Sequence, residues 1–214
     1  MAGKTGIALI IFLLLIPGVL GFVPVVGGLD NYILPSSSSV NIFYNNGFLR
    51  NTYFINDSTT GIGDYETLLL EPNTMVSDTD SIALVASDGL KLIDRYVTPV
   101  GSPGATLVKG SEWRFFNYAT VDSAAGANYI VIVGKLRFND GSFGTEFVNT
   151  TSEVITSTSI PQYTQTRAAV GRMYLNSTDR IAIEYYGKTT SSSSRTLTIY
   201  HCGTEYSTHL ATYT

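Results

Sequence analysis

The sequence predicts an all-β protein, and three observations lead to that prediction. Beyond residue 40, no window repeats apolar residues at the i, i+3, i+4, i+7 spacing of an amphipathic helix. Short runs rich in β-branched and aromatic residues recur instead, bounded by turn residues, as is typical of antiparallel sandwiches and barrels. Ser and Thr supply about a fifth of the 214 residues, with 14 Tyr and 20 Gly beside them. One β-sandwich over residues 40–214 is the preferred organisation.

An apolar segment precedes the sandwich. Lys4 is the one charge before Asp30, and residues 7–16 are unbroken apolar sequence. We expect an apolar helix here, with membrane-anchoring side chains from Ile7, Leu9, Ile10, Ile11, Phe12, Leu13, Leu14, Leu15 and Ile16. A lysine, an apolar run and then Pro17-Gly18 follow the order of a cleaved signal peptide.

Two other interpretations of this segment stay open. Residues 1–29 approach the length of a retained membrane anchor, although Pro17, Pro24 and the Gly27-Gly28 pair interrupt them. The segment would alternatively pack against a partner subunit. Signal and anchor both imply a body that is delivered across a membrane or attached to one. Residues 30–39, with Pro35 and four serines, form a polar spacer.

Ten strands are predicted in the body. They cover residues 40–44, 49–55, 82–86, 90–97, 111–119, 129–138, 144–148, 162–170, 180–186 and 195–201. Residues 97–104, which carry two prolines and two glycines, are the most linker-like interior stretch and mark a candidate sub-boundary.

Alternation predicts which side chains point to the core. Ile181, Ile183 and Tyr185 share one face of their strand, as do Leu197 and Ile199 of theirs. Residues 129–133 are apolar on both faces, which indicates a central strand covered on each side. Residues 139–141, Asn-Asp-Gly, predict a hairpin turn.

Composition excludes several classes of protein. Charged residues make up 14% of the chain, against about 25% in ordinary globular proteins. The net charge of −4 disfavours nucleic acid as a partner, because phosphate binding needs a basic face. A hydrophobic fraction of 44% excludes disorder, and a single cysteine excludes an intramolecular disulfide framework. The charge shortage indicates a surface that neighbouring molecules cover.

A series of segments resembles a β-sandwich module of viral surface, capsid-associated and tail-associated proteins, over about three quarters of the chain. The segments are 63–68 (Gly-Asp-Tyr-Glu-Thr-Leu), 112–115 (Glu-Trp-Arg-Phe), 153–158 (Glu-Val-Ile-Thr-Ser-Thr), 175–181 (Leu-Asn-Ser-Thr-Asp-Arg-Ile), 186–189 (Tyr-Gly-Lys-Thr), 195–200 (Arg-Thr-Leu-Thr-Ile-Tyr) and 203–212 (Gly-Thr-Glu-Tyr-Ser-Thr-His-Leu-Ala-Thr). The resemblance implies a jelly-roll-like sandwich and a virion structural or host-attachment role.

No residue pattern predicts catalysis, a metal site or a cofactor. His201 and Cys202 are adjacent in a strand, so their side chains are expected on opposite faces and not as a thiolate–imidazole pair. His201, Glu205 and His209 lack a recognised metal-ligand spacing. Asp78 and Asp80 are expected in a solvated turn.

Two groups of residues are candidate surface sites. Asn56, Asn149 and Asn176 stand in glycosylation sequons, which a translocated protein would expose. Five tyrosines favour a subunit interface, and ordinary core or rim positions and a glycan platform are the alternatives. They are Tyr185, Tyr186, Tyr200, Tyr206 and Tyr213.

The leading hypothesis is therefore a non-enzymatic, oligomeric virion protein, a minor capsid or membrane-associated surface component. Its partners would be other virion or surface-lattice proteins, and the membrane through its N-terminal segment. The alternatives are a secreted or cell-surface adhesion or carbohydrate-binding sandwich, and a filament subunit that lends a strand to its neighbour.

Overall fold

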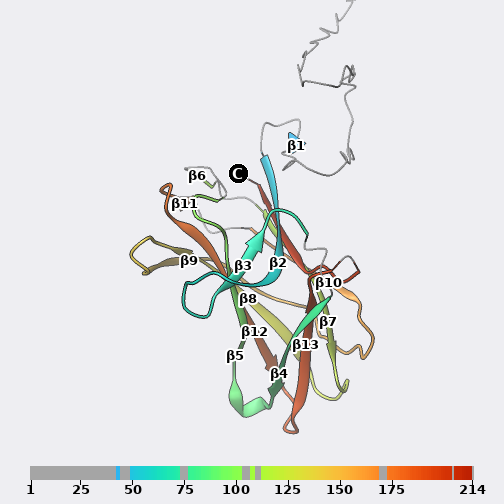
Figure 1. Ribbon diagram of the computed structural model, residues 1–214. Coiled ribbons are helices and arrows are strands. Elements are labelled where there is room, and N and C mark those ends of the chain that lie inside the picture. The colour runs from blue at the N-terminus through green and yellow to red at the C-terminus, as the bar shows by residue number, and fades with distance from the viewer. Residues whose placement is uncertain are drawn as a thin grey trace, which may run out of the picture. The chain divides into compact units, whose positions relative to one another are not determined.

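Strands dominate the computed structural model, which describes residues 42–43, 49–72, 77–102, 107–108, 112–168, 173–203 and 205–213 (Figure 1). The strands are β1 (Ile42–Phe43), β2 (Leu49–Thr59), β3 (Glu66–Leu69), β4 (Asp78–Leu84), β5 (Lys91–Val97), β6 (Leu107–Val108), β7 (Glu112–Val121), β8 (Asn128–Arg137), β9 (Phe143–Thr151), β10 (Gln162–Ala168), β11 (Met173–Tyr174), β12 (Arg180–Thr189), β13 (Arg195–His201) and β14 (His209–Tyr213). The described helical structure is one 3₁₀ turn, Ala86–Asp88. The prediction of an all-β protein is confirmed.

The strands form one long hydrogen-bonded path, in the order β4-β13-β7-β14-β2-β3-β5-β12-β8-β9. Strand β1 adds to β2 and β10 adds to β7, whereas β6 and β11 pair separately. Strands β3 and β5 are parallel, and the other neighbours in the large sheet run antiparallel. Residues Asn41–Thr214 make up one compact unit.

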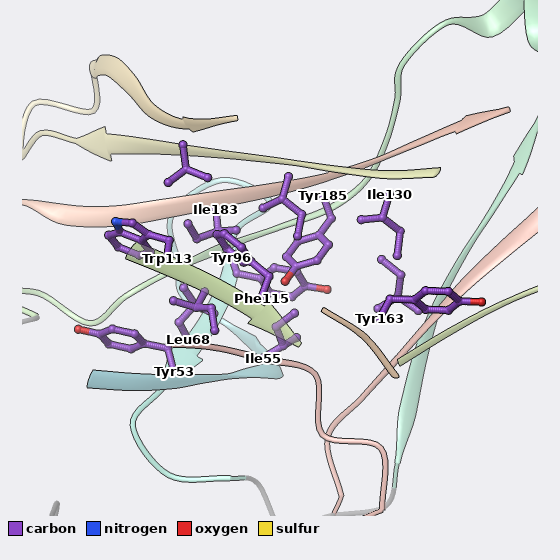
Figure 2. Close-up of a cluster of buried hydrophobic side chains, with 14 of the residues drawn as sticks. Tyr53, Ile55, Leu68, Tyr96, Trp113, Phe115, Ile130, Tyr163, Ile183 and Tyr185 are labelled. Atoms are coloured by element: carbon purple, nitrogen blue, oxygen red, sulfur yellow. The ribbon is translucent and has the colours of Figure 1, made fainter. Parts of the chain in front are cut away.

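The two halves of this path meet across a shared core (Figure 2). Trp113 of β7 packs on Phe147 of β9 across the two halves, with 4.9 Å between ring centroids. Within one half, Tyr96 of β5 meets Tyr185 of the neighbouring β12 edge to face at 5.7 Å. Gly187 of β12 lies against Leu84 of β4. A Cβ at position 187 would lie 2.7 Å from Leu84 Cδ1, so this close approach of the two halves requires glycine. The domain is thus a β-sandwich whose inner side chains interdigitate.

The predicted core-facing side chains are buried, but Ala182 and Glu184 on the opposite face of β12 are buried as well. Ile181, Ile183 and Tyr185 are buried in the core, as are Leu197 and Ile199. Strand β8 is buried on both faces over residues 130–133, as a central strand requires. The predicted hairpin joins β8 to β9, with Gly141 at φ +87°.

Five strands differ from the prediction. Strand β4 begins at Asp78 and not in the predicted 82–86, and strands β3, β6, β11 and β14 were not predicted. The predicted N-terminal helix, with Ile7 to Ile16, and the spacer 30–39 lie outside the described residues. In the part of the chain that the structure describes, no helix is long and apolar enough to cross a membrane.

Candidate functional site

The outer face of the half-sheet formed by β4, β13, β7, β10, β14 and β2 carries a continuous set of side chains, all but one of them uncharged. The pairing registers place them in four rows across the strands: Ser81 with Thr198 and Thr120; Thr79 with Tyr200, Tyr118 and Gln162; Phe54 with His209, Phe116 and Thr164; and Thr52 with Ala211, Arg114 and Thr166. We call these residues, with Tyr206 of the β13–β14 turn, the aromatic–threonine face.

Charge is almost absent from this face. Arg114 is the one charged residue in the four rows, and it forms an ion pair with Glu112 of the same strand. Thr120 and Ala211 are buried, and the other members of the rows are half-buried or exposed. The surface is therefore accessible and nearly neutral.

Ring contacts hold the aromatic side chains in place. His209 stacks on Phe116 with 4.6 Å between centroids and an interplanar angle of 17°, and Phe54 packs on the same imidazole at 5.2 Å. Tyr206 meets Tyr118 edge to face at 5.7 Å. Because these rings already contact one another, they form a preorganised surface and not separate mobile side chains.

Thr208 fixes the turn that carries Tyr206. Its side chain is fully buried, and its hydroxyl donates to the Tyr200 carbonyl at 2.5 Å. The same oxygen accepts a hydrogen bond from the Tyr118 backbone N–H at 3.1 Å, and the Thr208 carbonyl accepts one from Ile55 N–H. One side chain thus ties β7, β13 and the turn together.

Replacing Thr208 with valine is expected to destabilise the fold by about 1–3 kcal/mol, because it strands a buried N–H and a buried carbonyl. Serine at the same position keeps the hydroxyl and should cost clearly less. Urea unfolding followed by circular dichroism measures both variants. Equal losses for valine and serine would contradict the role given to the hydroxyl.

The opposite outer face, on β5, β12, β8 and β9, is charged. Glu184 accepts hydrogen bonds from Lys135 Nζ at 2.9 Å, Tyr65 OH at 3.0 Å and Tyr186 OH at 2.6 Å. These hydrogen bonds lower the pKa of Glu184 although burial acts against them. Arg95 lies over the Tyr65 ring. The two outer faces of the sandwich therefore differ sharply in charge.

Beneath the β13–β14 turn, acidic side chains gather on the inner side of the strands. They come from four strands, and they are Asp57 of β2, Glu66 of β3, Asp78 and Asp80 of β4, and Asp94 of β5. Asp57 and Asp78 are exposed, and the other three are half-buried. Asp80 Oδ2 accepts a hydrogen bond from Tyr96 OH at 2.6 Å and lies 2.8 Å from His201 Nε2, a close contact without hydrogen-bond alignment. We call these five residues the acidic cluster.

Burial and the closeness of the carboxyl groups to one another shift the pKa values of three acids in this cluster. Burial raises the pKa of Glu66 to about 8, and the nearby Asp94 and Asp57 carboxyls add to that rise. Burial also raises the pKa of Asp94 to about 6. A hydrogen bond with Asp57 lowers the pKa of Asp78. Glu66 and Asp94 thus keep their protons at pH values where ordinary carboxyls have lost them.

The expectation that His201 and Cys202 point to opposite faces is wrong. Cys202 has φ +57°, outside the extended region, so its thiol turns back and lies 3.3 Å from His201 Nδ1. The side chain of Asp80 thus contacts the His201 imidazole, which in turn contacts the Cys202 thiol, in the order that a nucleophilic site would have. Cys202 is nevertheless 3% exposed, and burial raises the pKa of its thiol. A buried neutral thiol is a poor nucleophile.

His201 and His209, which with Glu205 lack the spacing of metal ligands, also point to different sides of the sheet. His201 points into the core, whereas His209 lies on the aromatic–threonine face. In the residues described, no group of three or more His, Cys, Asp or Glu side chains is arranged to hold a metal ion. Asp78 and Asp80, expected in a solvated turn, lie in strand β4.

The five predicted interface tyrosines fall in different places. Tyr200 and Tyr206 lie on the aromatic–threonine face, 5.9 Å apart. Tyr185 is fully buried in the core, so its prediction as an interface residue is wrong. Tyr186 lies on the charged outer face, and the side chain of Tyr213 is outside the described part of the chain.

The three sequons differ in accessibility. Asn56 is 4% exposed, and its amide donates to Ser58 at 2.7 Å and Thr67 at 3.0 Å, so it is a poor acceptor in the folded chain. Asn149 on β9 and Asn176 before β12 are exposed. These two side chains are therefore accessible, although the amide of Asn149 donates to Glu146 and that of Asn176 donates to Asp179.

Solved structures with a similar fold exist. The chain is similar to an aminopeptidase from the marine sediment archaeon Thaumarchaeota archaeon, with a TM-score of 0.53 and 7% identity over 76% of this chain and 36% of that one. It is also similar to a CocE/NonD family hydrolase from Staphylococcus aureus, with a TM-score of 0.52 and 7% identity over 78% of this chain and 37% of that one. The chain thus spans little more than a third of each, and the likeness shows the fold alone.

The expected resemblance to a viral sandwich module is wrong. No protein-family model and no curated protein matches the sequence, and the similar solved structures named above are hydrolytic enzymes, not viral proteins. The segments that suggested it describe strands and turns, such as 195–200 in β13, which many all-β proteins share.

Proposed function

We propose that this chain is a non-enzymatic, jelly-roll-like subunit that associates with further copies of itself through the aromatic–threonine face. The observation that carries the proposal is the uncharged, preorganised surface of the four rows on one side of the sandwich. Depletion of charge and enrichment in Tyr and Phe are typical of interface cores.

The chemistry of the face suits a second copy. Threonine, serine and tyrosine hydroxyls both donate and accept hydrogen bonds, so a surface of hydroxyls is complementary to itself. Each copy carries a net charge of −4, so two copies repel least where they meet on a neutral face. The four rows hold about fifteen side-chain positions on one face of the sheet. At the usual spacing of strands and residues they cover roughly 500 Å² per copy, near the lower limit of a specific interface. We therefore expect a concentration-dependent association.

The ring geometry favours a protein partner over a sugar. A pyranose stacks on an open aromatic face, whereas His209 and Phe116 stack on each other. Tyr118 OH accepts a hydrogen bond from Gln162, and Tyr200 OH is bonded to Thr120, so both hydroxyls have neighbours. The glycan platform stays an untested prediction.

The buried environment of Cys202 supports a non-enzymatic role. The activities in the names of the similar hydrolases belong to proteins that are nearly three times longer than the matched region. The chain's placement in a virion, at a membrane or on a cell surface stays a prediction, and so does strand addition to a neighbour. The resemblance that suggested a virion role no longer supports it.

Analytical ultracentrifugation of the full-length chain tests the proposal. Thr164→Lys, at an exposed position of β10, and Tyr118→Lys, at a half-buried position of β7, both add charge to the face. Each substitution would be repeated across a symmetric interface, and we expect at least a roughly tenfold weaker self-association.

Tyr129→Lys is the matched control. Tyr129 is equally half-buried, but it pairs with Lys188 on the charged outer face. The control should associate like the unmodified chain. An unmodified chain that stays monomeric at high concentration, or a control that loses association as strongly as Tyr118→Lys, would overturn the proposal.

A further inference from the structure

Strand β10 lies at an edge of its half-sheet. Its pairing with β7 is unbroken over seven residues, from Gln162 to Ala168. In the part of the chain that the structure describes, β7 is the one strand with which β10 pairs. Strand β9 of the opposite half lies close to β10, but its Phe147 packs on Trp113 of β7. Strand β9 thus lies against the inner side of this half-sheet and does not continue it.

The hydrogen bonds between β7 and the chain around β10 show which backbone groups of β10 point outward. Ala119 N–H donates to the Pro161 carbonyl at 3.4 Å, in the same register that joins the two strands. Hydrogen-bonded pairs alternate with non-hydrogen-bonded pairs in an antiparallel ladder. Every second residue counted from Pro161 therefore directs its N–H and C=O to β7. The residues between them, Gln162, Thr164 and Thr166, direct theirs away from β7.

These outward backbone groups of β10 are not paired. A hydrogen bond on the other side of β7, from Tyr118 N–H to Thr208, agrees with the alternation. Among the described residues, no hydrogen bond reaches the backbone N–H or C=O of Gln162, Thr164 or Thr166. A row of unpaired backbone groups along a strand edge favours pairing with another strand.

Strands β4 and β9, which end the hydrogen-bonded path, carry features that oppose such pairing. The Ala83 carbonyl of β4 accepts a hydrogen bond from Lys91 Nζ at 2.9 Å. The pairing of β9 with β8 has two register shifts, both between Gly134 and Arg137 of β8. Strand β10 has a regular register, contains neither proline nor glycine, and carries one charged residue, Arg167. Its edge therefore lacks the protection that the other two have.

We propose that β10 pairs edge to edge with β10 of a second copy, antiparallel and about a two-fold axis at Gln165, so that the two half-sheets become one continuous sheet. A register centred on Gln165 overlaps the whole seven-residue strand. It also places the outward N–H and C=O of Thr164 opposite those of the partner's Thr166. This contact uses backbone groups at an edge, so it goes beyond the proposed function and does not depend on the aromatic–threonine face.

The side chains of β10 suit pairing with a copy of the same strand. In this register Arg167 lies opposite the partner's Tyr163 and not opposite a second arginine, so no like charges meet. Thr164 and Thr166 become cross-strand neighbours, and β-branched residues favour strand pairing. The two-fold edge contact closes as a dimer. Together with a contact through the aromatic–threonine face, it would join the copies into longer assemblies.

Amide hydrogen exchange of the full-length chain, followed by NMR, tests the edge contact directly, because face-to-face packing forms no bonds with edge amides. We expect exchange at Thr164 and Thr166 to slow at least roughly tenfold between dilute and concentrated protein. Thr151 on β9 is the internal control. The bond from Ser152 N–H to the Ile130 carbonyl places the Thr151 N–H on the side away from β8, so its exchange should not change. Exchange at Thr164 and Thr166 that is independent of concentration would overturn the proposal.

Proline substitution is the second measurement, read by analytical ultracentrifugation. Thr166→Pro removes an outward N–H without breaking a bond to β7. It should associate at least roughly tenfold more weakly than Thr166→Val, which removes the same hydroxyl and keeps the N–H. Thr151→Pro, the matched control on the β9 edge, should associate like the unmodified chain.

The variants also separate the two contacts. Equal association of Thr166→Pro and Thr166→Val, or an equal loss in Thr151→Pro, would overturn edge pairing. If Thr166→Pro weakens association while Tyr118→Lys does not, the edge contact stands and the proposed function fails. The reverse result supports the aromatic–threonine face and overturns the edge contact.

Discussion

Trp113→Ala is expected to lower the free energy of unfolding by about 3–5 kcal/mol, the range for truncating a large buried aromatic residue. Trp113 is 0% exposed and lies among the largest core side chains (Figure 2). Its contact with Phe147 joins β7 in one half of the sheet to β9 in the other. The cavity left by alanine would therefore lie between the two halves, where neither can move in to fill it.

Trp113→Phe is the matched variant for this prediction. Its ring retains the contact with Phe147, and the indole N–H has no hydrogen-bond partner among the described residues, so no polar bond is lost. We expect a loss of about 1–2 kcal/mol. Far-UV circular dichroism in urea is the suitable measurement, because Trp113 is the one tryptophan and both variants lack it. Similar losses for alanine and phenylalanine would contradict the packing role.

Gly126→Ala is expected to cost about 2–5 kcal/mol, through two effects that add. Gly126, between β7 and β8, has φ +83°, where an L side chain is strained. A Cβ there would also lie 2.8 Å from Ser191 Cβ and 2.9 Å from Ser191 N, and backbone atoms do not yield readily.

Gly61→Ala separates the two effects. Gly61 has a similar φ of +70°, but nothing lies within 4 Å of the position that a Cβ would take. Its loss should be the backbone strain alone, about 1–2 kcal/mol. Thermal unfolding of both variants gives the difference, which measures the clash with Ser191. A Gly61 variant as unstable as the Gly126 variant would refute this account.

Much of the fold could be predicted from local pattern. Ile181, Ile183 and Tyr185 occupy every second position of their strand, and that period of two placed them in the core. The strands that were not predicted are short: β6 and β11 have two residues each, β3 has four and β14 has five. Asp78 and Asp80 concealed the start of β4, because acidic residues are typical of turns.

The candidate site was harder to predict, because it depends on pairing between distant strands. Tyr200 and Tyr206 were expected at an interface, but Phe54, Phe116 and His209 join them only through the registers of β2, β7 and β14. The acidic cluster depends on similar pairings: Glu66 lies opposite Tyr96, and Asp80 lies opposite Ile199. Their alternation with Leu68, Ile82 and Leu84 was the signal that these acids point inward.

Local backbone conformation explains the error at Cys202. The prediction assumed extended backbone at both His201 and Cys202, which sends neighbouring side chains to opposite faces. The left-handed conformation of Cys202 reverses its side chain. Few residues other than glycine adopt this conformation, so no sequence pattern indicated it.

Concentration-dependent NMR of the full-length chain, with threonine methyl groups and aromatic rings labelled, tests the central claim most directly. The account predicts that raising the protein concentration shifts the signals of Thr164, Thr198 and Tyr118 on the aromatic–threonine face. The signals of Tyr129 and Tyr186 on the charged face should stay in place. Shifts confined to the charged face, or no shift on either face, would contradict association through the aromatic–threonine face.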